Sequence, residues 1–240
     1  MPRFFVDNVN GDFITLDGEN AKHISRSLRM KIGDIITVSD GSANDYGCEI
    51  ENISSDTVNL KVLYSQPSEV EPTVKVTLYQ GVPKGDKMED IIQKCVEIGV
   101  SKIVPVLTHR SVSRPDEKSA KKKNDRYQKI ALEAAKQSGR GIVPTVEPMI
   151  SFKTAVENAN EKIKILFYEG GGKPLTQIID KNIKSAAVFI GPEGGFEKEE
   201  VDLILEKGGI NVTLGKRILR TQTAPVAALS AIMLLTGNLE

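Results

Sequence analysis

Hydrophobic residues follow two different rhythms along the chain, and the change comes near residue 70. Up to residue 64, short runs such as 35–38 and 58–62 alternate apolar and polar positions, and Asn-Gly and Asp-Gly turn signals separate them. Alternation with a period of two is typical of half-buried strands. The first part therefore predicts a small all-β unit, a barrel, interrupted by one short helix at residues 20–28.

After a linker at residues 66–72, which contains two prolines, strands and helices alternate. One predicted helix starts with Asp86 as its cap and ends at Gly99. Such alternation implies parallel strands in an open sheet with helices on both faces. The sequence thus predicts a β domain at residues 1–70 and an α/β domain at 73–240. We expect strands at 74–78, 103–107, 163–168, 186–190 and 210–214, and helices at 86–98, 124–138, 174–181, 198–207 and 225–235.

Composition narrows the class of protein. The 240 residues include 32 basic and 32 acidic side chains, and 40% are hydrophobic, as in ordinary soluble globular proteins. The longest apolar run, 224–235, is too short to span a bilayer, and the start of the chain lacks the apolar stretch of a signal peptide. We therefore expect a cytoplasmic protein. Two cysteines and two histidines exclude a disulfide scaffold and a zinc cluster, so no metal is expected.

Charge is unevenly distributed although the total is zero. Residues 1–72 carry 6 basic and 12 acidic side chains, whereas residues 84–140 carry 14 and 8. Within the acidic part, residues 21–31 contain four cations and no acid. Such local basic stretches attract phosphates over about 8 Å at physiological salt. The run Lys121–Lys123 is either a solvated face or a further phosphate contact.

Three loops that follow predicted strands carry the candidate chemistry, because ligands bind at the carboxyl ends of parallel strands. The first, 189–196, holds three glycines and Pro192, which let backbone N–H groups approach a ligand. It matches neither the dinucleotide nor the triphosphate glycine motif. The second, 214–225, places Arg217 and Arg220 around an apolar pair, with Thr223 as a candidate helix cap. The third, 167–172, again puts glycines after a strand. If the strands are neighbours, the loops form one pocket.

These residues carry a family resemblance. The sequence IGPEGGF, followed some twenty residues later by LGxRILRTxTA, resembles the ribosomal RNA small-subunit uridine-N3 methyltransferases of the SPOUT superfamily. The segments at Pro2–Phe5, at His23 with Leu28-Arg29, and at Glu97–Val100 also resemble that family. The resemblance implies an amino-terminal PUA-like β-barrel that holds RNA and a carboxyl-terminal α/β domain with a deep trefoil knot. It also implies a homodimer that uses S-adenosylmethionine to form N3-methyluridine in 16S ribosomal RNA of the small ribosomal subunit.

The same resemblance assigns the cofactor site to the three loops. Arg220 is the candidate catalytic residue, a fixed cation for the charge that builds on uracil O2 and O4. Glu193 either bonds to the cofactor or accepts hydrogen bonds from loop amides. The residues expected to bind the cofactor are Phe167, Tyr168, Glu169, Ile190, Gly191, Pro192, Glu193, Gly194, Gly195, Leu214, Gly215, Ile218, Leu219, Thr223 and Ala224.

One position departs from the family pattern: Gln222 stands where the LRTETA run has Glu. An amide cannot accept a proton as a carboxylate can, so this side chain is not expected to act as a general base. His109 is the only histidine in the sequence of this domain. Proton loss to water, or assisted by the backbone, is therefore as good a candidate as proton loss to a side-chain base.

RNA contacts are expected from both domains, with phosphate contacts dominant. The absence of tryptophan argues against an aromatic platform for base stacking. His23 has an alternative role as a hydrogen-bonded residue that closes the barrel, and His109 as a residue that fixes a loop. The candidates are Arg3, Lys22, His23, Arg26 and Arg29 in the barrel, and Arg110, Arg114 and Lys121–Lys123 in the α/β domain.

The helix at 225–235 is apolar on nearly every side, so it is buried either within one subunit or at a two-fold interface. Two further functions stay open beside uridine-N3 methylation. One is a related methyltransferase that modifies another nucleotide of ribosomal or transfer RNA. The other is a catalytically silent RNA-binding or assembly protein, against which the intact glycine loop and Arg220 argue.

Overall fold

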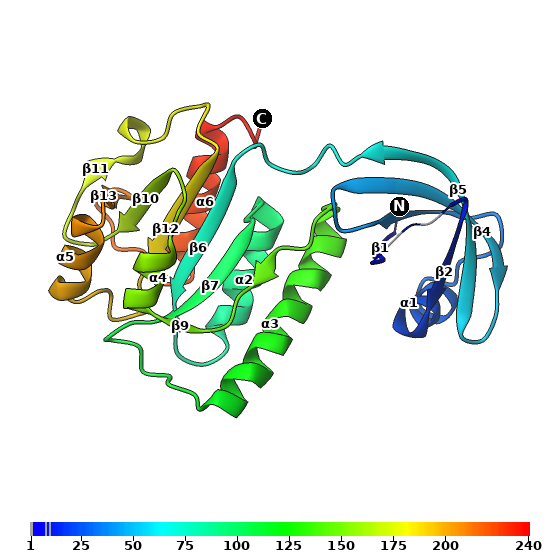
Figure 1. The fold of residues 1–240 in the computed structure, drawn as a ribbon, viewed down its shortest axis with the longest axis horizontal. Coiled ribbons are helices and arrows are strands. Elements are labelled where there is room, and N and C mark those ends of the chain that lie inside the picture. The colour runs from blue at the N-terminus through cyan, green and yellow to red at the C-terminus, as the bar shows by residue number, and fades with distance from the viewer. Residues whose placement is uncertain (1, 8, 10) are drawn as a thin grey trace. The chain divides into compact units, whose positions relative to one another are not determined.

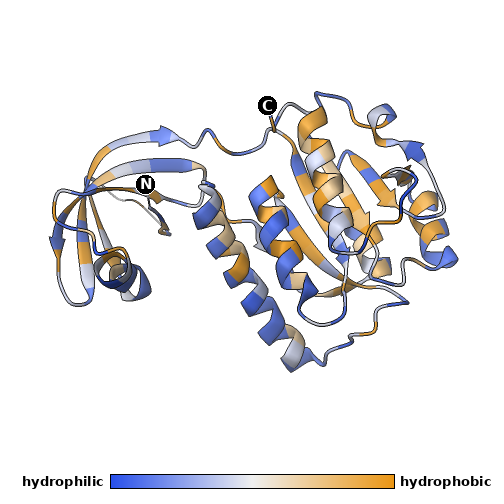
Figure 2. Cartoon of the chain, turned by 180° about the vertical axis from the view of Figure 1, so that it is seen from behind, coloured by the Kyte–Doolittle hydropathy of each residue, from blue (hydrophilic) through white to orange (hydrophobic). Residues whose placement is uncertain are grey.

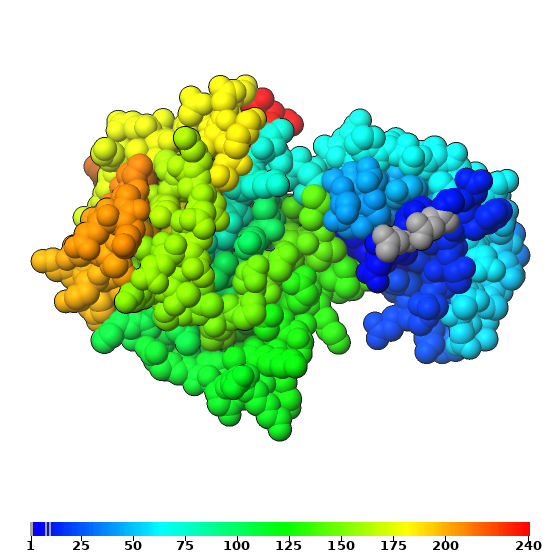
Figure 3. All heavy atoms as spheres, in the orientation of Figure 1, coloured from blue at the N-terminus to red at the C-terminus, as the bar shows by residue number. Residues whose placement is uncertain are grey.

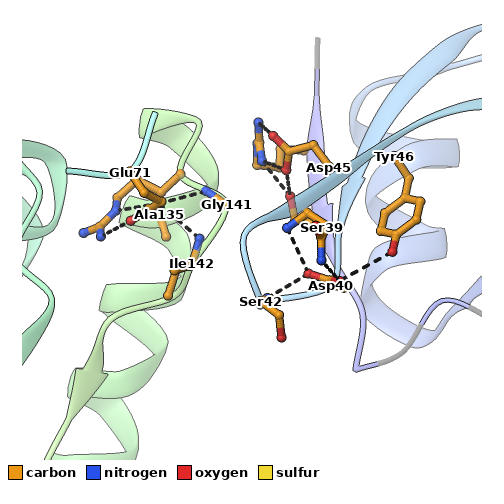
Figure 4. Close-up of polar contacts among 12 residues, drawn as sticks. Ser39, Asp40, Ser42, Asp45, Tyr46, Glu71, Ala135, Gly141 and Ile142 are labelled. Atoms are coloured by element: carbon orange, nitrogen blue, oxygen red, sulfur yellow. Dashed lines mark hydrogen bonds and ion pairs between the residues drawn. The ribbon is translucent and has the colours of Figure 1, made fainter. Parts of the chain in front are cut away.

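The computed structural model describes residues 2–7, 9 and 11–240, which form two compact units. One unit holds the chain up to residue 71 together with 135–143, and the other holds 72–134 and 144–240. The sequence placed 135–143 in the second domain, so the division differs there. The reason is a buried ion pair: Arg140, 4% exposed, bonds to the Glu71 carboxylate, which also accepts the N–H groups of Gly141 and Ile142 (Figure 4).

A strongly twisted sheet of five strands builds the first unit (Figure 1). Buried and exposed residues alternate along its strands, as in β2, where Ile14 and Leu16 are buried between exposed neighbours. The predicted helix is present, but it begins at Gly18 and its second half is a π-helix, in which the Leu28 N–H reaches the His23 carbonyl. The strands run in the order β1 (Arg3–Phe5), β3 (Ile35–Ser39), β4 (Asn44–Ile53), β5 (Thr57–Pro67) and β2 (Phe13–Asp17), with α1 (Gly18–Lys22) and η1 (His23–Ser27) after β2.

The second unit is an α/β structure whose described strand pairings are all parallel, which confirms the predicted class. Strand β12 is buried along most of its length, as expected for a central strand with helices on both faces. The order is β11 (Lys173–Pro174), β13 (Ile210–Thr213), β10 (Ile163–Phe167), β12 (Ser185–Ile190), β6 (Lys75–Gly81), β7 (Lys102–Leu107) and β8 (Thr145–Val146), and β9 (Ile150–Ser151) also pairs with β7.

Helices cover both faces of this sheet (Figures 1 and 2). Helices α2 (Lys87–Ile98) and α6 (Thr223–Leu235) pack together on one face, and α4 (Phe152–Asn158) and α5 (Lys198–Glu206) on the other. Hydrophobic colouring runs along the central strands and along α6 beside the carboxyl terminus (Figure 2). Phe189 lies fully buried in the core and stacks on Tyr79, with ring centroids 4.5 Å apart. This core fixes the strand ends from which the candidate loops emerge.

Several element boundaries differ from the sequence prediction. Helix α3 (Glu117–Ser138) begins seven residues before the predicted start, because the Asp116 carboxylate accepts the Ser119 N–H at 2.8 Å and caps it. Its lysine-rich first half lies at the surface, in green in Figure 3. The predicted helix 174–181 is only the 3₁₀ turn η2 (Leu175–Gln177). Helix α4 was not predicted; its cap is Ser151, which accepts the Thr154 N–H. The trefoil knot stays a prediction.

Candidate active site

The three candidate loops emerge side by side at one edge of the sheet. Strand β10 lies between β12 and β13, and all three run parallel, so their carboxyl ends point the same way (Figure 1). The condition that the sequence left open, that these strands are neighbours, is therefore met. The loops after them enclose one cavity of about 430 Å³ within the second unit.

A tight turn shapes the loop after β12. The Gly195 N–H donates to the Pro192 carbonyl at 3.0 Å, and Gly195 has a φ of +70°, which favours glycine. A side chain at Gly191 would meet the Gly195 backbone at 3.0–3.1 Å. Glycine is therefore required at these two positions by the packing of the loop on itself. The approach of backbone N–H groups to a ligand stays a prediction.

Two buried polar side chains fasten this loop to the loop after β13. The Thr221 hydroxyl donates to the Gly191 carbonyl at 2.9 Å, and Gln80 Nε2 donates to the same carbonyl at 3.4 Å and to the Thr221 hydroxyl at 3.2 Å. Gln80 is the next-to-last residue of strand β6 and is fully buried. Sequence reasoning missed both residues. A glutamine at the end of an otherwise apolar strand was the available signal, because buried polar groups need partners.

Glu193 lines the cavity and is held by other residues of the chain. Its carboxylate forms an ion pair with Lys87 and accepts the Lys84 N–H at 3.2 and 3.3 Å. Burial raises the pKa of Glu193, but these hydrogen bonds outweigh it and keep the pKa below its ordinary value. Of the two roles left open for Glu193, acceptance of chain amides is the one present. Lys87, which lines the cavity, was not among the predicted residues.

The loop after β10 adds a second carboxylate. A side chain at Gly195 would meet the Glu169 oxygens at 3.3 Å, so this carboxylate lies against the turn of the neighbouring loop. Gly172 lies so close to the Asn211 carbonyl that a Cβ there would be 2.6 Å from it. Phe167 and Tyr168 lie at the start of the loop and line the cavity.

The loop after β13 presents cations and aliphatic side chains to the same cavity. Ile218 is 83% exposed, and Arg217 and Arg220 are exposed beside it. The predicted cap Thr223 is wrong: the helix is capped at Gln222, since the N–H groups of Thr223 and Ala224 both reach the Arg220 carbonyl. The N-cap of α6 (Thr223–Leu235) therefore lies one residue earlier than the sequence suggested.

Most residues predicted for the cofactor line the cavity, and two do not. Gly194 turns its carbonyl to Arg110 Nη1, and Thr223 lies in the first turn of α6. The predicted residues that line it are Phe167, Tyr168, Glu169, Ile190, Gly191, Pro192, Glu193, Gly195, Leu214, Gly215, Ile218, Leu219, Arg220 and Ala224, and those not predicted include Lys87, Phe196, Val212, Thr213, Lys216, Thr221 and Gln222.

Gln222, the departure from the family pattern, contacts an acid on the neighbouring helix. Its Nε2 donates to Asp90 Oδ2 at 3.4 Å, and Asp90 also pairs with Lys94. Because an ionised carboxylate only accepts hydrogen bonds, it selects the amide nitrogen as the group that faces it. An acid at position 222 would bring a second negative charge to Asp90.

The predicted RNA contacts of the first unit divide into two groups. Arg3 is an internal ion-pair partner: its guanidinium bonds to Asp45 and Ser39, and its side chain is 12% exposed. Figure 4 shows Asp45 and Ser39 side by side. Lys22, His23, Arg26 and Arg29 are exposed, and the His23 ring lies edge-on to Phe4. The charge of Arg3 is thus paired inside the fold, and its contact with RNA stays a prediction.

In the second unit, the cations near residue 110 also contact the chain. Arg110 bonds to Glu197 through Nε at 2.9 Å and Nη2 at 3.0 Å, and this pair lowers the pKa of Glu197. Arg114 Nη2 donates to the Thr108 carbonyl at 2.9 Å. His109 is exposed, and its backbone N–H donates to Glu200, which fits a role in fixing the loop. Lys121 and Lys122 are exposed on α3.

Within residues 2–7, 9 and 11–240, no three His, Cys, Asp or Glu side chains are grouped so as to hold a metal ion. No helix in the same described residues has the length and hydropathy needed to cross a membrane.

Comparison with known proteins agrees with this geometry. A family model described as an RNA methyltransferase domain matches residues 70–233, and one described as an RNA methyltransferase PUA domain matches residues 16–63. The chain is 37% identical to ribosomal RNA small subunit methyltransferase E of Bacillus subtilis (strain 168), over 97% of this chain and 96% of that protein. It is 33% identical to the protein of the same name from Synechocystis sp. (strain ATCC 27184 / PCC 6803 / Kazusa), over 91% and 72%.

A solved structure is similar over the full length. The crystal structure of a ribosomal RNA small subunit methyltransferase E from Neisseria gonorrhoeae, bound to S-adenosyl methionine, superposes with a TM-score of 0.90 and 32% identity. The match covers 98% of each chain.

Proposed function

The chain belongs to the ribosomal RNA small subunit methyltransferase E family, and from that premise we propose that it methylates N3 of one uridine in 16S ribosomal RNA, with S-adenosylmethionine as the methyl donor. The observation that carries this proposal is the convergence of the three motif loops on one cavity. We assign the methyl transfer to the unit that starts after the linker and RNA binding to both units.

The cavity fits the donor in size and chemistry. A volume of about 430 Å³ falls within the usual range of small-molecule sites, about 300–1,000 Å³. Aliphatic side chains, glycine backbone and the carboxylate of Glu169 line it, which suits an apolar ring beside polar and cationic groups. Residues 167–169, 190–195 and 214–219, with Ala224, would hold it. When bound, S-adenosylmethionine supplies a methyl group that its sulfonium already activates.

The chain's own part in the reaction is mainly positioning. Thr221 and Gln80 fix the Gly191 carbonyl and so hold the two main loops at a constant distance. Alignment of reactants in this way is worth up to about 7–11 kcal/mol of the barrier. Arg220, exposed at the cavity, provides the fixed cation for negative charge on uracil O2 and O4.

Proton removal from N3 does not require a carboxylate at position 222. Gln222 is bound to Asp90 through its amide nitrogen, so it serves to orient and does not accept the proton. His109 is exposed outside the residues that line the cavity. We assign the proton to water, which reaches the open side of the cavity beside Ile218.

We further propose a homodimer in the cytoplasm, where ribosomal RNA is made and assembled. Helix α6 buries one face against its own subunit, with Leu229 and Ile232 fully buried. Its other face is incompletely covered, and Leu234 is 56% exposed there. A second copy of the chain would cover this apolar face.

The decisive experiment is mass spectrometry of nucleosides from small-subunit RNA of cells with and without the gene. Loss of N3-methyluridine supports the proposal, whereas loss of another modified nucleotide indicates a different target. Calorimetry with S-adenosylmethionine tests the silent alternative: no heat at millimolar cofactor would leave only RNA binding. Arg220→Ala should abolish turnover and keep the fold, while Arg126→Ala, a matched exposed arginine of the same unit, should keep both.

A further inference from the structure

Two large aliphatic side chains are exposed within the basic stretch of the first unit. Leu28 is 39% exposed and Ile32 is 65% exposed. Single exposed apolar residues are common and need no explanation, but a pair in one short segment does. Leu28 lies within the acid-free run 21–31, and Ile32 directly follows it.

The segment that carries them is anchored by its backbone. The Leu28 N–H donates to the His23 carbonyl at 2.9 Å and closes the π-helix, and the Met30 N–H donates to the Ile24 carbonyl at 3.1 Å. Met30, between the two exposed residues, packs against the core of the unit. The chain therefore buries one apolar side chain and exposes those on either side of it.

Ile32 occupies the tip of a closed turn. The Asp34 N–H donates to the Lys31 carbonyl at 3.1 Å, and the Asp34 carboxylate accepts the Lys31 N–H at 2.7 Å. Gly33 has a φ of +90° and donates its N–H to the Ile50 carbonyl of β4 at 2.8 Å. A side chain on a turn fixed at three points is preorganised, so it loses little freedom when a partner binds it.

The backbone around Leu28 is also unusual. The π-helix at His23–Ser27 and the positive φ of Arg29, +53°, follow one another directly. Both are disfavoured conformations that are enriched at binding sites.

Four exposed cations lie close to the exposed pair along the chain. Lys22, Arg26, Arg29 and Lys31 are all exposed, and the nearby Asp34 carboxylate is already used on the Lys31 N–H. In Figure 3 the blue atoms of this part of the chain lie at the surface of their unit. Cations beside aliphatic groups match a polyanion whose flat apolar rings are accessible, which is RNA with unstacked bases.

We propose that Leu28 and Ile32 contact unstacked bases of the RNA substrate, while these four cations contact its phosphates. The proposal rests on the proposed function in that the substrate is RNA, and it adds the part of the surface that reads bases. It also explains how a chain without tryptophan touches bases: aliphatic side chains on a rigid turn take the place of an aromatic platform.

The test compares salt dependence. Binding of in vitro transcribed 16S ribosomal RNA by the full chain is measured between about 50 and 200 mM potassium chloride. The double variant Leu28→Ser and Ile32→Ser should bind about tenfold more weakly at every salt concentration, with an unchanged slope of log affinity against log salt. The double variant Arg26→Gln and Arg29→Gln should lower that slope by about 1.4, since each phosphate contact contributes about 0.7 on single strands.

The matched control is Phe13→Ser, which removes a 61% exposed apolar side chain of the same unit. Phe13 stands opposite Lys61 of β5 and outside the basic run 21–31, so a nearby cation is present in the control as well. It should leave RNA affinity unchanged. The proposal is overturned if the Leu28 and Ile32 double variant binds RNA within twofold of the parent or changes the salt slope. Loss of a dimer in light scattering by that variant would instead assign the surface to a second copy of the chain.

The outcome is independent of the proposed reaction. A parent chain that binds RNA with this pattern but forms no N3-methyluridine would keep the base contact and remove the proposed function. A parent chain that forms N3-methyluridine, together with an aliphatic double variant that binds RNA normally, would keep the proposed function and remove the base contact.

Discussion

Gly81 offers a sharp test of the claim that strand β6 supports the cofactor loop. A Cβ at this glycine would lie 2.5 Å from Pro192 Cδ and 2.7 Å from Pro192 N. Its backbone is not left-handed, so alanine costs no conformational strain there, and the effect of Gly81→Ala is purely steric.

The magnitude follows from contact distances. Non-bonded carbon atoms approach to about 3.5–4.0 Å, so Pro192 must retreat by about 1 Å. The Gly191 carbonyl is bound to Thr221, and therefore the shift reaches both loops of the cavity. We expect overpacking to cost about 1–3 kcal/mol of stability. A misplacement of about 1 Å costs on the order of a hundredfold in rate.

Calorimetry with S-adenosylmethionine and thermal unfolding measure both effects. Gly81→Ala should bind the cofactor at least about tenfold more weakly. The control is Gly208→Ala, whose φ of +80° makes alanine strained by about 1 kcal/mol but whose Cβ meets no atom within 4 Å. It should lower Tm and leave cofactor binding intact. Cofactor affinity within twofold of the parent in Gly81→Ala would refute the support role of β6.

Three further predictions concern other parts of the molecule. Asp45→Asn should lower the free energy of unfolding by about 3 kcal/mol at neutral pH, because Arg3 loses its buried partner. Burial raises the pKa of Asp45, but bonds from Arg3 hold it below its ordinary value. The stabilisation is therefore present above about pH 3.9 and lost as pH falls through the lowered pKa; urea unfolding that shows the same difference at neutral and strongly acid pH would contradict this. Gln222→Glu places a second carboxyl about 3.4 Å from Asp90, which at the dielectric of water costs about 1 kcal/mol and holds the pKa of the introduced carboxyl above its ordinary value. The pH–rate profile should gain an acid limb from this carboxyl, and an unchanged profile removes this side chain from acid–base work. Leu234→Glu should convert a dimer to a monomer in size-exclusion chromatography with light scattering, with Tm nearly unchanged; a variant that stays dimeric would place the interface elsewhere.

Local pattern was enough to predict the architecture of the second unit. The alternation of apolar strands with helices, and glycines directly after three strands, predicted a parallel sheet whose loops could share a cavity. Helix α2 begins at the predicted cap position and ends at Gly99, which has a φ of +108°. Asp86 occupies the N-cap position as predicted, but its side chain makes no capping hydrogen bond.

Sequence patterns do not reveal contacts between residues that are far apart in the chain. Arg3 was assigned to RNA from its charge, and its ion pair with Asp45, 42 positions away, was not foreseen. Gln80 was overlooked because its partners, Gly191 and Thr221, lie 111 and 141 positions along the chain. Lys87 was overlooked as well, because its ion-pair partner Glu193 belongs to a loop far along the chain.

The sequence by itself determined the five longer strands of the second unit, the places of α2 and α5, and which loops carry glycine and cations, since these depend on neighbours a few positions apart. Only the tertiary structure decided that β10 lies between β12 and β13, that Gln80 and Thr221 lock two loops together, and that Leu28 and Ile32 are left exposed. The physical reason is that burial and hydrogen-bond satisfaction depend on segments that meet only after folding, and no local period encodes which segments these are.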